Sequence, residues 1–109
     1  MTLEPVAQTF PELAVIGSHL GYPWVDEMIA LTLLYENVYL CTDSYAPQHW
    51  PESLDAYVAG PGAGNVMFGT MWPTIPFERA IADIRAKELP SDAIDWLLGG
   101  TARTVYGID

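Results

Sequence analysis

The stretch Ala14-Val15-Ile16-Gly17-Ser18-His19-Leu20-Gly21 decides the fold of this chain. It lies in an apolar run over residues 13–20, which predicts a β-strand covered on both faces, as is typical of parallel sheets. His19 stands at the mouth of this strand. Because α/β sheets and barrels build their sites at the carboxyl ends of parallel strands, the position predicts a functional histidine.

Strands and helices alternate along the rest of the sequence. Runs of strand-like composition recur at residues 38–44 and 65–72. Apolar periodicity predicts helices over residues 24–35, 52–59, 76–87 and 92–98, a short helix over Thr2–Thr9 and one more turn over residues 101–106. Ser91 is expected to cap the 92–98 helix and Gly99-Gly100 to end it. The alternation predicts an α/β fold with three successive parallel strand–helix units and added C-terminal helices.

Composition limits what this chain can bind. Its 109 residues suit a single domain over residues 1–109, and half of them are hydrophobic. There are 14 acidic and 4 basic residues, a net charge of −10, and residues 1–78 contain no Lys or Arg. Phosphate groups and anionic lipids are bound through cations, so nucleic acid and membrane surfaces are not expected as partners.

The one cysteine, Cys41, is expected to be a small buried thiol. A single cysteine excludes an intramolecular disulfide and a cysteine-rich metal site. The N-terminus shows no signal-peptide pattern, and acidic residues interrupt every long apolar run. A cytoplasmic location is therefore expected.

Five motifs occur in the order Phe-Pro-Glu-Leu, Ile-Gly-Ser-His-Leu-Gly, Asn-Val-Tyr-Leu, Val-Met-Phe-Gly-Thr-Met-Trp-Pro and Leu-Leu-Gly-Gly-Thr-Ala-Arg. In order and spacing they resemble the C-terminal part of an amidohydrolase-related (amidohydrolase 2 type) metal-dependent hydrolase or decarboxylase, over residues 9–108. The resemblance implies a TIM barrel of which this chain would hold the sixth, seventh and eighth strands. Three parallel strands cannot close an eight-stranded barrel. The implied partners are the remainder of the barrel, or copies of this chain, and a small-molecule substrate.

The same resemblance assigns roles at two strand ends. It implies that His19, after the sixth strand, is an acid/base residue that touches the substrate or a metal-bound water. Met71 falls after the eighth strand, where the family usually carries a metal-binding Asp. The family's His-x-His pair and its fifth-strand histidine have no counterpart here. A thioether is a soft, neutral ligand that does not suit Zn²⁺. We therefore expect no metal ligands and no cofactor for this chain alone, and a divalent metal such as zinc only in a completed barrel.

Other polar and aromatic residues near the expected mouth allow two interpretations. Asp43 ends the second strand, where a carboxylate could serve the site or cap the loop to Tyr45. Tyr22 and Trp72 flank the mouth and could line a substrate pocket or simply pack. Two further residues are expected outside the site: His49 in a solvent-exposed loop and Trp96 in the core.

Three functional hypotheses follow from these residues. The first is a partial amidohydrolase-like enzyme, inactive as this chain alone, for hydrolysis or non-oxidative decarboxylation of a small organic acid. The second is a non-catalytic α/β module that self-associates or docks on a partner, suggested by Met71 and by open sheet edges. The third is a metal-independent relative in which His19 and Asp43 act without an ion.

Overall fold

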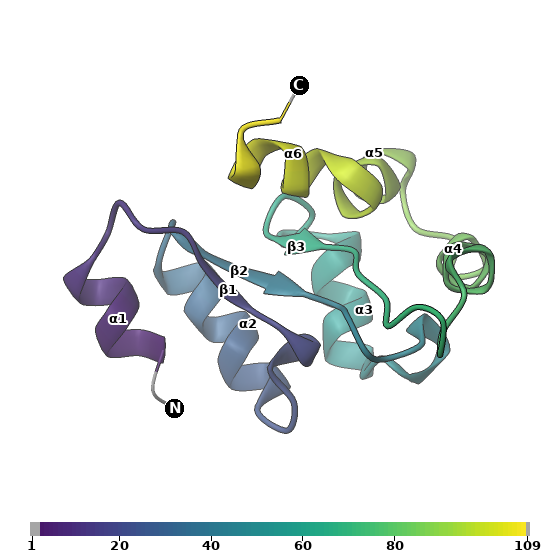
Figure 1. The fold of residues 1–109 in the computed structure, drawn as a ribbon, viewed down its shortest axis with the longest axis horizontal. Helices are drawn as coiled ribbons and strands as arrows, with labels where there is room; N and C mark the ends of the chain where they lie inside the picture. Colours follow the sequence, from purple (N-terminus) through teal and green to yellow (C-terminus); the bar gives the residue numbers. More distant parts are fainter. Residues whose placement is uncertain (1–2, 109) are drawn as a thin grey trace.

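The computed structural model describes residues 3–108 and contains one parallel sheet of three strands in the order β1–β2–β3. Strand β1 (Val15–Gly17) pairs with β2 (Val38–Cys41), and β2 pairs with β3 (Val66–Met67). The register places Val15 opposite Val38 and Leu40 opposite Val66. The predicted series of parallel strand–helix units is confirmed, and each strand is shorter than its apolar run (Figure 1).

Helices connect and flank the three strands. The helices are α1 (Leu3–Thr9), α2 (Val25–Leu34), α3 (Glu52–Ala59), α4 (Phe77–Arg85), α5 (Ser91–Asp95) and α6 (Thr101–Tyr106). Three shorter segments complete the fold: the turn η1 (His19–Gly21), the 3-10 turn η2 (Pro47–His49) and the π-helical segment η3 (Trp96–Gly100). Thr2, predicted to begin the first helix, lies outside the described residues.

The two faces of the sheet are covered differently. Val15, Val38, Leu40 and Val66 are buried on the face that packs on α2, and a side chain at Gly17 would collide with Met28 of that helix. The alternate strand residues Ile16, Tyr39 and Cys41 are only half-buried. Since successive strand residues point to opposite faces, these three lie on the other side of the sheet. Figure 1 shows α2 and α3 behind the strands and no helix in front of β1 and β2.

Buried polar groups tie neighbouring elements together. The Thr32 hydroxyl donates to the Ile29 carbonyl at 2.7 Å, and the Tyr57 hydroxyl lies 2.6 Å from Thr32 Oγ1. The Thr32 hydroxyl has only one proton, which it donates to Ile29, so the Tyr57 hydroxyl donates to Thr32 Oγ1. The Tyr57 oxygen in turn accepts a hydrogen bond from Asn65 Nδ2 at 3.0 Å. The network links α2, α3 and the residue before β3. Asn37 acts similarly before β2, where its Nδ2 lies 2.9–3.3 Å from three main-chain carbonyls, those of Ala7, Phe10 and Leu13.

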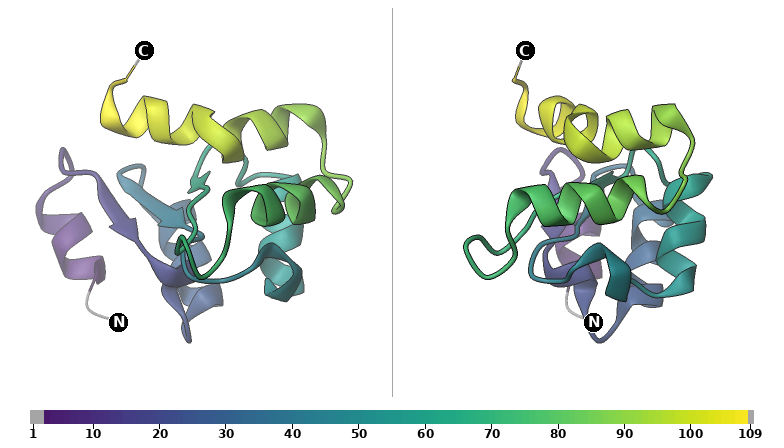
Figure 2. Two further views of the ribbon diagram at one scale, coloured as in Figure 1. Left: turned by 45° about the vertical axis from the view of Figure 1, so that its right-hand side comes forward. Right: turned by 90° about the vertical axis from the view of Figure 1, so that its right-hand side faces the viewer.

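The C-terminal helix differs from the sequence prediction. Gly99-Gly100 does not end it: α5, η3 and α6 follow one another without a break, and the helix ends where Gly107 adopts a φ of +67°. Ser91 is the first helical residue and its side chain does not cap the helix. Figure 2 shows this long helix crossing one end of the sheet beside α4.

Trp96 was expected in the core, and this is wrong, because 40% of it is exposed. The same helix buries Ala93, Leu97 and Thr101 instead. Trp96 is one position before Leu97 and therefore lies on a different side of the helix.

No helix among residues 3–108 is long and apolar enough to cross a membrane.

Candidate functional site

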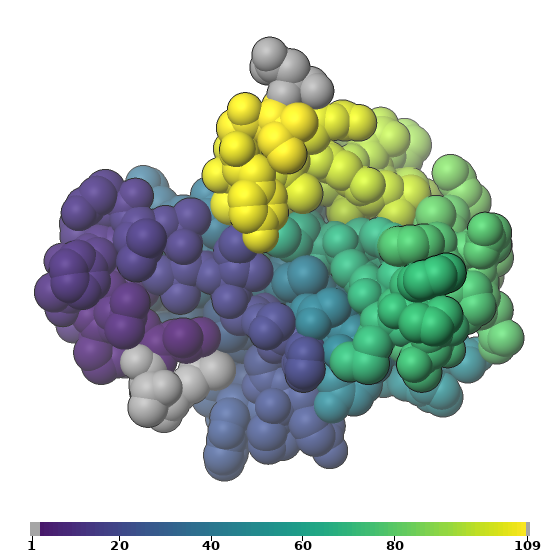
Figure 3. All heavy atoms as spheres, viewed as in Figure 1, coloured from purple at the N-terminus to yellow at the C-terminus, as the bar shows by residue number. Residues whose placement is uncertain are grey.

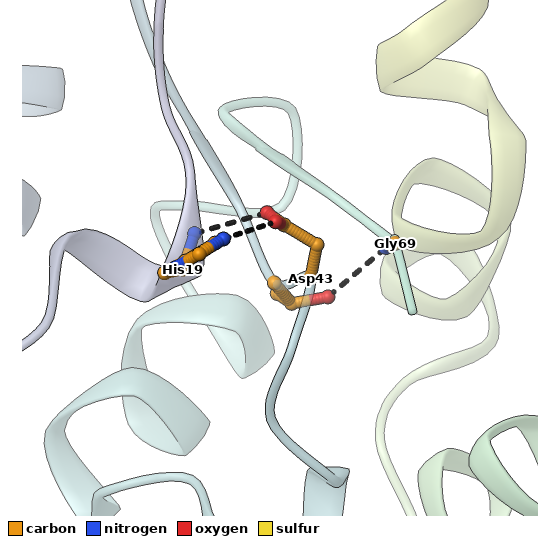
Figure 4. A network of polar contacts seen from close by, with 4 residues as sticks. His19, Asp43 and Gly69 are labelled. Carbon is orange, nitrogen blue, oxygen red and sulfur yellow. Dashed lines mark hydrogen bonds and ion pairs between the residues drawn. The ribbon is translucent and has the colours of Figure 1, made fainter. Parts of the chain in front are cut away.

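His19 and Asp43 meet where β1 and β2 end. Asp43 Oδ1 accepts the main-chain N–H of His19 at 2.9 Å, and Asp43 Oδ2 lies 3.2 Å from His19 Nε2. One carboxylate thus contacts both the backbone and the imidazole of one residue (Figure 4). The His19 side chain is 54% exposed and that of Asp43 is 24% exposed, so the pair remains accessible from outside.

The backbone at this site takes an uncommon conformation. His19, Leu20 and Gly21 have φ values of +55°, +59° and +76°. For residues with a side chain, this left-handed region is disfavoured and is often found at functional sites. The Leu20 side chain is almost completely buried and fixes the turn in the core. Ser44, directly after Asp43, also has a positive φ of +75°.

The end of the third strand supports Asp43 from the other side. Gly69 N–H donates to the hydroxyl of Thr42, a fully buried residue, at 3.2 Å. A Cβ atom at Gly69 would lie only 3.1 Å from the Cβ of Asp43. Gly69 therefore allows the third strand exit to approach Asp43 closely. The sequence alone does not single out Gly69 or Thr42, because this approach depends on how β2 and β3 are paired.

Cys41 lies close to the same contact. Its sulfur would be 3.0 Å from a Cβ at Gly69. It was expected to be a buried thiol and is half-buried. Burial raises the pKa of the Cys41 thiol to about 11. The thiol is therefore neutral near neutral pH and is not an activated nucleophile.

The other residues predicted for the mouth are spread out. Tyr22 is 63% exposed and its ring packs on Tyr45, with ring centroids 5.4 Å apart. Tyr22 also lines a shallow pocket of about 430 Å³, which it shares with Trp24, Asp26, Glu27, Pro51 and other neighbours, but not with His19 or Asp43. Trp72 is 64% exposed, and no hydrogen bond, ion pair or ring contact found within residues 3–108 joins it to His19, Asp43 or Tyr22.

Asp43 does not cap the loop to Tyr45 through a side-chain hydrogen bond in the described part of the chain, and it contacts His19 instead. Met71 lies four residues beyond β3 and is about half exposed. His49 is exposed, as predicted. Its only polar side-chain contact found within residues 3–108 is Gln48 Nε2, 3.4 Å from its Nε2.

A complete metal site is not formed by these residues. Among residues 3–108, no group of three or more His, Cys, Asp or Glu side chains is arranged to hold a metal ion. A catalytic zinc ion takes about three protein ligands plus water. His19 and Asp43 already contact one another, and Met71 offers no charge. The described residues alone therefore do not fit a catalytic metal centre.

Comparison with solved structures identifies the architecture to which these units correspond. The chain is similar to an uncharacterized TIM-barrel protein from Bordetella bronchiseptica, with a TM-score of 0.86 and 27% sequence identity. The match covers 97% of this chain and 38% of the Bordetella protein, so the chain spans well under half of that barrel. The three strand–helix units thus have the arrangement of part of a TIM barrel.

Comparison of the sequence gives the family. No curated protein matches significantly. The family model for amidohydrolases matches residues 1–108, which is nearly the whole chain. This match agrees with the order of strand-end motifs and with the barrel-like arrangement of the three units. The chain belongs to the amidohydrolase family.

Proposed function

We propose that this chain forms the C-terminal part of a barrel hydrolase of the amidohydrolase family, and that His19 is its acid/base residue. The reaction class is hydrolysis or non-oxidative decarboxylation of a small organic acid. The observation that carries the proposal is the contact of His19 with Asp43 at the carboxyl ends of adjacent parallel strands. Barrel enzymes place their reacting groups at this end of the sheet.

The uncovered sheet face supports a role for the remainder of the barrel. Ile16, Tyr39 and Cys41 present apolar side chains on the face without helices. In a closed barrel this face points to the interior and is filled with side chains. The N–H of Val15 donates to the carbonyl of Asn37, directly before β2, so the N–H of Ile16 points to the free edge of β1. That edge has a geometry that would accept a further parallel strand.

The partner that we propose is the remaining part of the barrel rather than copies of this chain. Copies with three strands each cannot supply the eight strands of a barrel. The net charge of −10 also makes the chain repel its own copies. Figure 3 shows the N-terminal segment at the left margin of the visible face and the C-terminal segment at its upper margin. A partner could contact both margins.

The metal ligands, which residues 3–108 do not supply, would come from the partner strands. We assign no step to a metal. What this chain supplies is an exposed imidazole, held by one carboxylate, that can accept or donate a proton at the mouth of the sheet. Such a residue contributes about 10²–10⁴-fold to a reaction rate.

A histidine substitution in the protein that carries the complete barrel tests this proposal. The probes are small carboxylic acids and lactones, with product formation measured. We expect His19→Gln to lower kcat/KM by about 10²–10⁴-fold, and the exposed His49→Gln to leave it unchanged. Equal activity of the two variants would exclude the acid/base role. Assays with and without a chelator decide whether turnover needs a metal or uses His19 and Asp43 alone.

The exposed apolar residues favour a second candidate, a non-catalytic docking module. Leu33 and Leu34 on α2 are each at least 60% exposed, and Met71 is exposed where the family carries Asp. A Met71→Asp variant separates the candidates in the completed barrel. Gain of zinc binding favours an enzyme that has lost a ligand. A barrel that holds no zinc either before or after the substitution favours the docking module.

A further inference from the structure

We infer that Asp43 is a positioning residue that holds the neutral His19 imidazole as its Nε2–H tautomer, which leaves Nδ1 as the proton-accepting nitrogen. The inference rests on the proposed function for its catalytic meaning, since a fixed tautomer decides which nitrogen faces a substrate. The tautomer itself can be measured on this chain without any substrate.

The chemistry of the two groups favours one tautomer. An ionised carboxylate only accepts hydrogen bonds. A neutral imidazole has one N–H donor and one acceptor nitrogen. Nε2 of His19 lies 3.2 Å from Asp43 Oδ2, at ion-pair distance, and a negative carboxylate at this distance favours a proton rather than a lone pair on Nε2. The lone pair then lies on Nδ1, and the exposed imidazole can present it to a bound molecule.

Asp43 can select the tautomer because its carboxylate is held in place. Oδ1 accepts the main-chain N–H of His19 at 2.9 Å, so rotation of the carboxylate would break this hydrogen bond. Gly69 packs close to the Cβ of Asp43 from the third strand exit. Figure 4 shows the carboxylate between His19 on one side and the strand exit that contains Gly69 on the other.

The histidine is fixed as well. Its main chain belongs to the left-handed turn η1, and the following Leu20 is buried in the core. The main chain that carries the imidazole is therefore held beside Asp43, and the contact of Nε2 with Oδ2 places the ring against the carboxylate. Asp43 thus has the role that the buried carboxylate has in a serine-protease triad, where it selects a histidine tautomer. Here the two nitrogens have exchanged roles, because the carboxylate contacts Nε2.

Nitrogen-15 NMR of the uniformly labelled 109-residue protein tests the inference. Long-range correlations from the ring protons distinguish a protonated from an unprotonated nitrogen, and the spectra are recorded at alkaline pH, where histidines are neutral. We expect His19 to show one tautomer, with the proton on Nε2. A proton on Nδ1, or a mixture of tautomers like that of a free imidazole, overturns the inference. His49, which is exposed, is the control in the same spectrum.

An Asp43→Asn variant makes the prediction sharper. The asparagine oxygen is needed by the His19 main-chain N–H, so the amide NH₂ faces Nε2 and donates to it. We therefore expect the proton to move to Nδ1, with His49 unchanged. Persistence of the Nε2–H form in the variant contradicts a positioning role. If the variant fails to fold, the wild-type spectrum alone still decides.

The NMR experiment and the turnover test have independent outcomes, so a failure of the positioning role can be told apart from a failure of the proposed function. A wild-type Nε2–H tautomer in a barrel that turns over none of the probes refutes the proposed function and leaves the positioning role intact. An active barrel whose His19 is the Nδ1–H tautomer refutes the positioning role and leaves the function intact.

Discussion

Replacing His19 by Ala or by Gly tests whether the turn after β1 is strained. Both changes remove the imidazole and keep the main-chain N–H that donates to Asp43. They differ only by one methyl group at a position with a φ of +55°. At such a position the left-handed conformation costs a residue with a side chain about 1–2 kcal/mol, and Gly does not have this cost.

The magnitude follows from two opposing contributions. The Gly variant is stabilised because the strain at this position is relieved. It is destabilised by about 0.5–1 kcal/mol because Gly makes the unfolded chain more flexible, so that folding costs more conformational entropy. The Gly variant should therefore be more stable than the Ala variant by up to about 1.5 kcal/mol. For a domain of this size, 1 kcal/mol corresponds to a shift in Tm of about 4–8 °C.

Thermal unfolding followed by circular dichroism measures the difference. The matched control is the same pair at His49, which is exposed in η2 and has no positive φ. There the order should be reversed, with Gly less stable than Ala by about 0.5–1 kcal/mol. If Ala were the more stable replacement at both positions, the turn at His19 would not be strained and the argument from its backbone would fail.

Three further substitutions or reagents test the packing around the site. Tyr57→Phe should lower the free energy of unfolding in urea by about 1–3 kcal/mol, since it deletes a hydroxyl shared by two polar partners. The exposed Tyr106→Phe should change it by less than about 0.5 kcal/mol, and equal effects would contradict the network. Alkylation of Cys41 at about pH 8 should be about 100-fold slower than that of an unburied thiol, because its pKa is raised to about 11. The raised pKa of Cys41 also stabilises the fold: this contribution is fully present below the ordinary thiol pKa and is lost as the pH rises towards 11. Fast alkylation at about pH 8, or a free energy of unfolding that increases towards pH 11, would contradict the raised pKa. Gly69→Ala should destabilise by about 1–3 kcal/mol, since its methyl group would lie 3.0 Å from the Cys41 sulfur, whereas Gly64→Ala, which meets nothing within 4 Å, should not.

The sequence predicted the order of elements well because its apolar runs are separated by clear turn residues. Residues 13–20 and 38–44 contain the observed β1 and β2, and their parallel pairing brings His19 and Asp43 to the same edge. Proximity of these two residues follows from strand order alone. Which atoms meet does not, because it depends on the left-handed turn at residues 19–21.

Errors of prediction came from longer-range packing. Gly99-Gly100 resembles a helix stop, yet Gly100 is helical, and a Cβ there would be 3.0 Å from the Trp96 ring. Trp96 was expected in the core and is 40% exposed, because its neighbour Leu97 occupies the buried side of the helix. Local residue preferences do not report which side of a helix meets a sheet.

Native mass spectrometry tests most directly the claim that this chain forms part of a metal-dependent barrel. The samples are the 109-residue protein and the intact protein or complex that carries this sequence in its source cells. We predict a metal-free 109-residue chain, because residues 3–108 do not form a three-ligand site. We predict that the intact species contains the further barrel strands, on one polypeptide or two, together with a zinc-sized adduct. A bare, metal-free monomer from the source cells would contradict the account, and so would zinc bound stoichiometrically by the 109-residue chain alone.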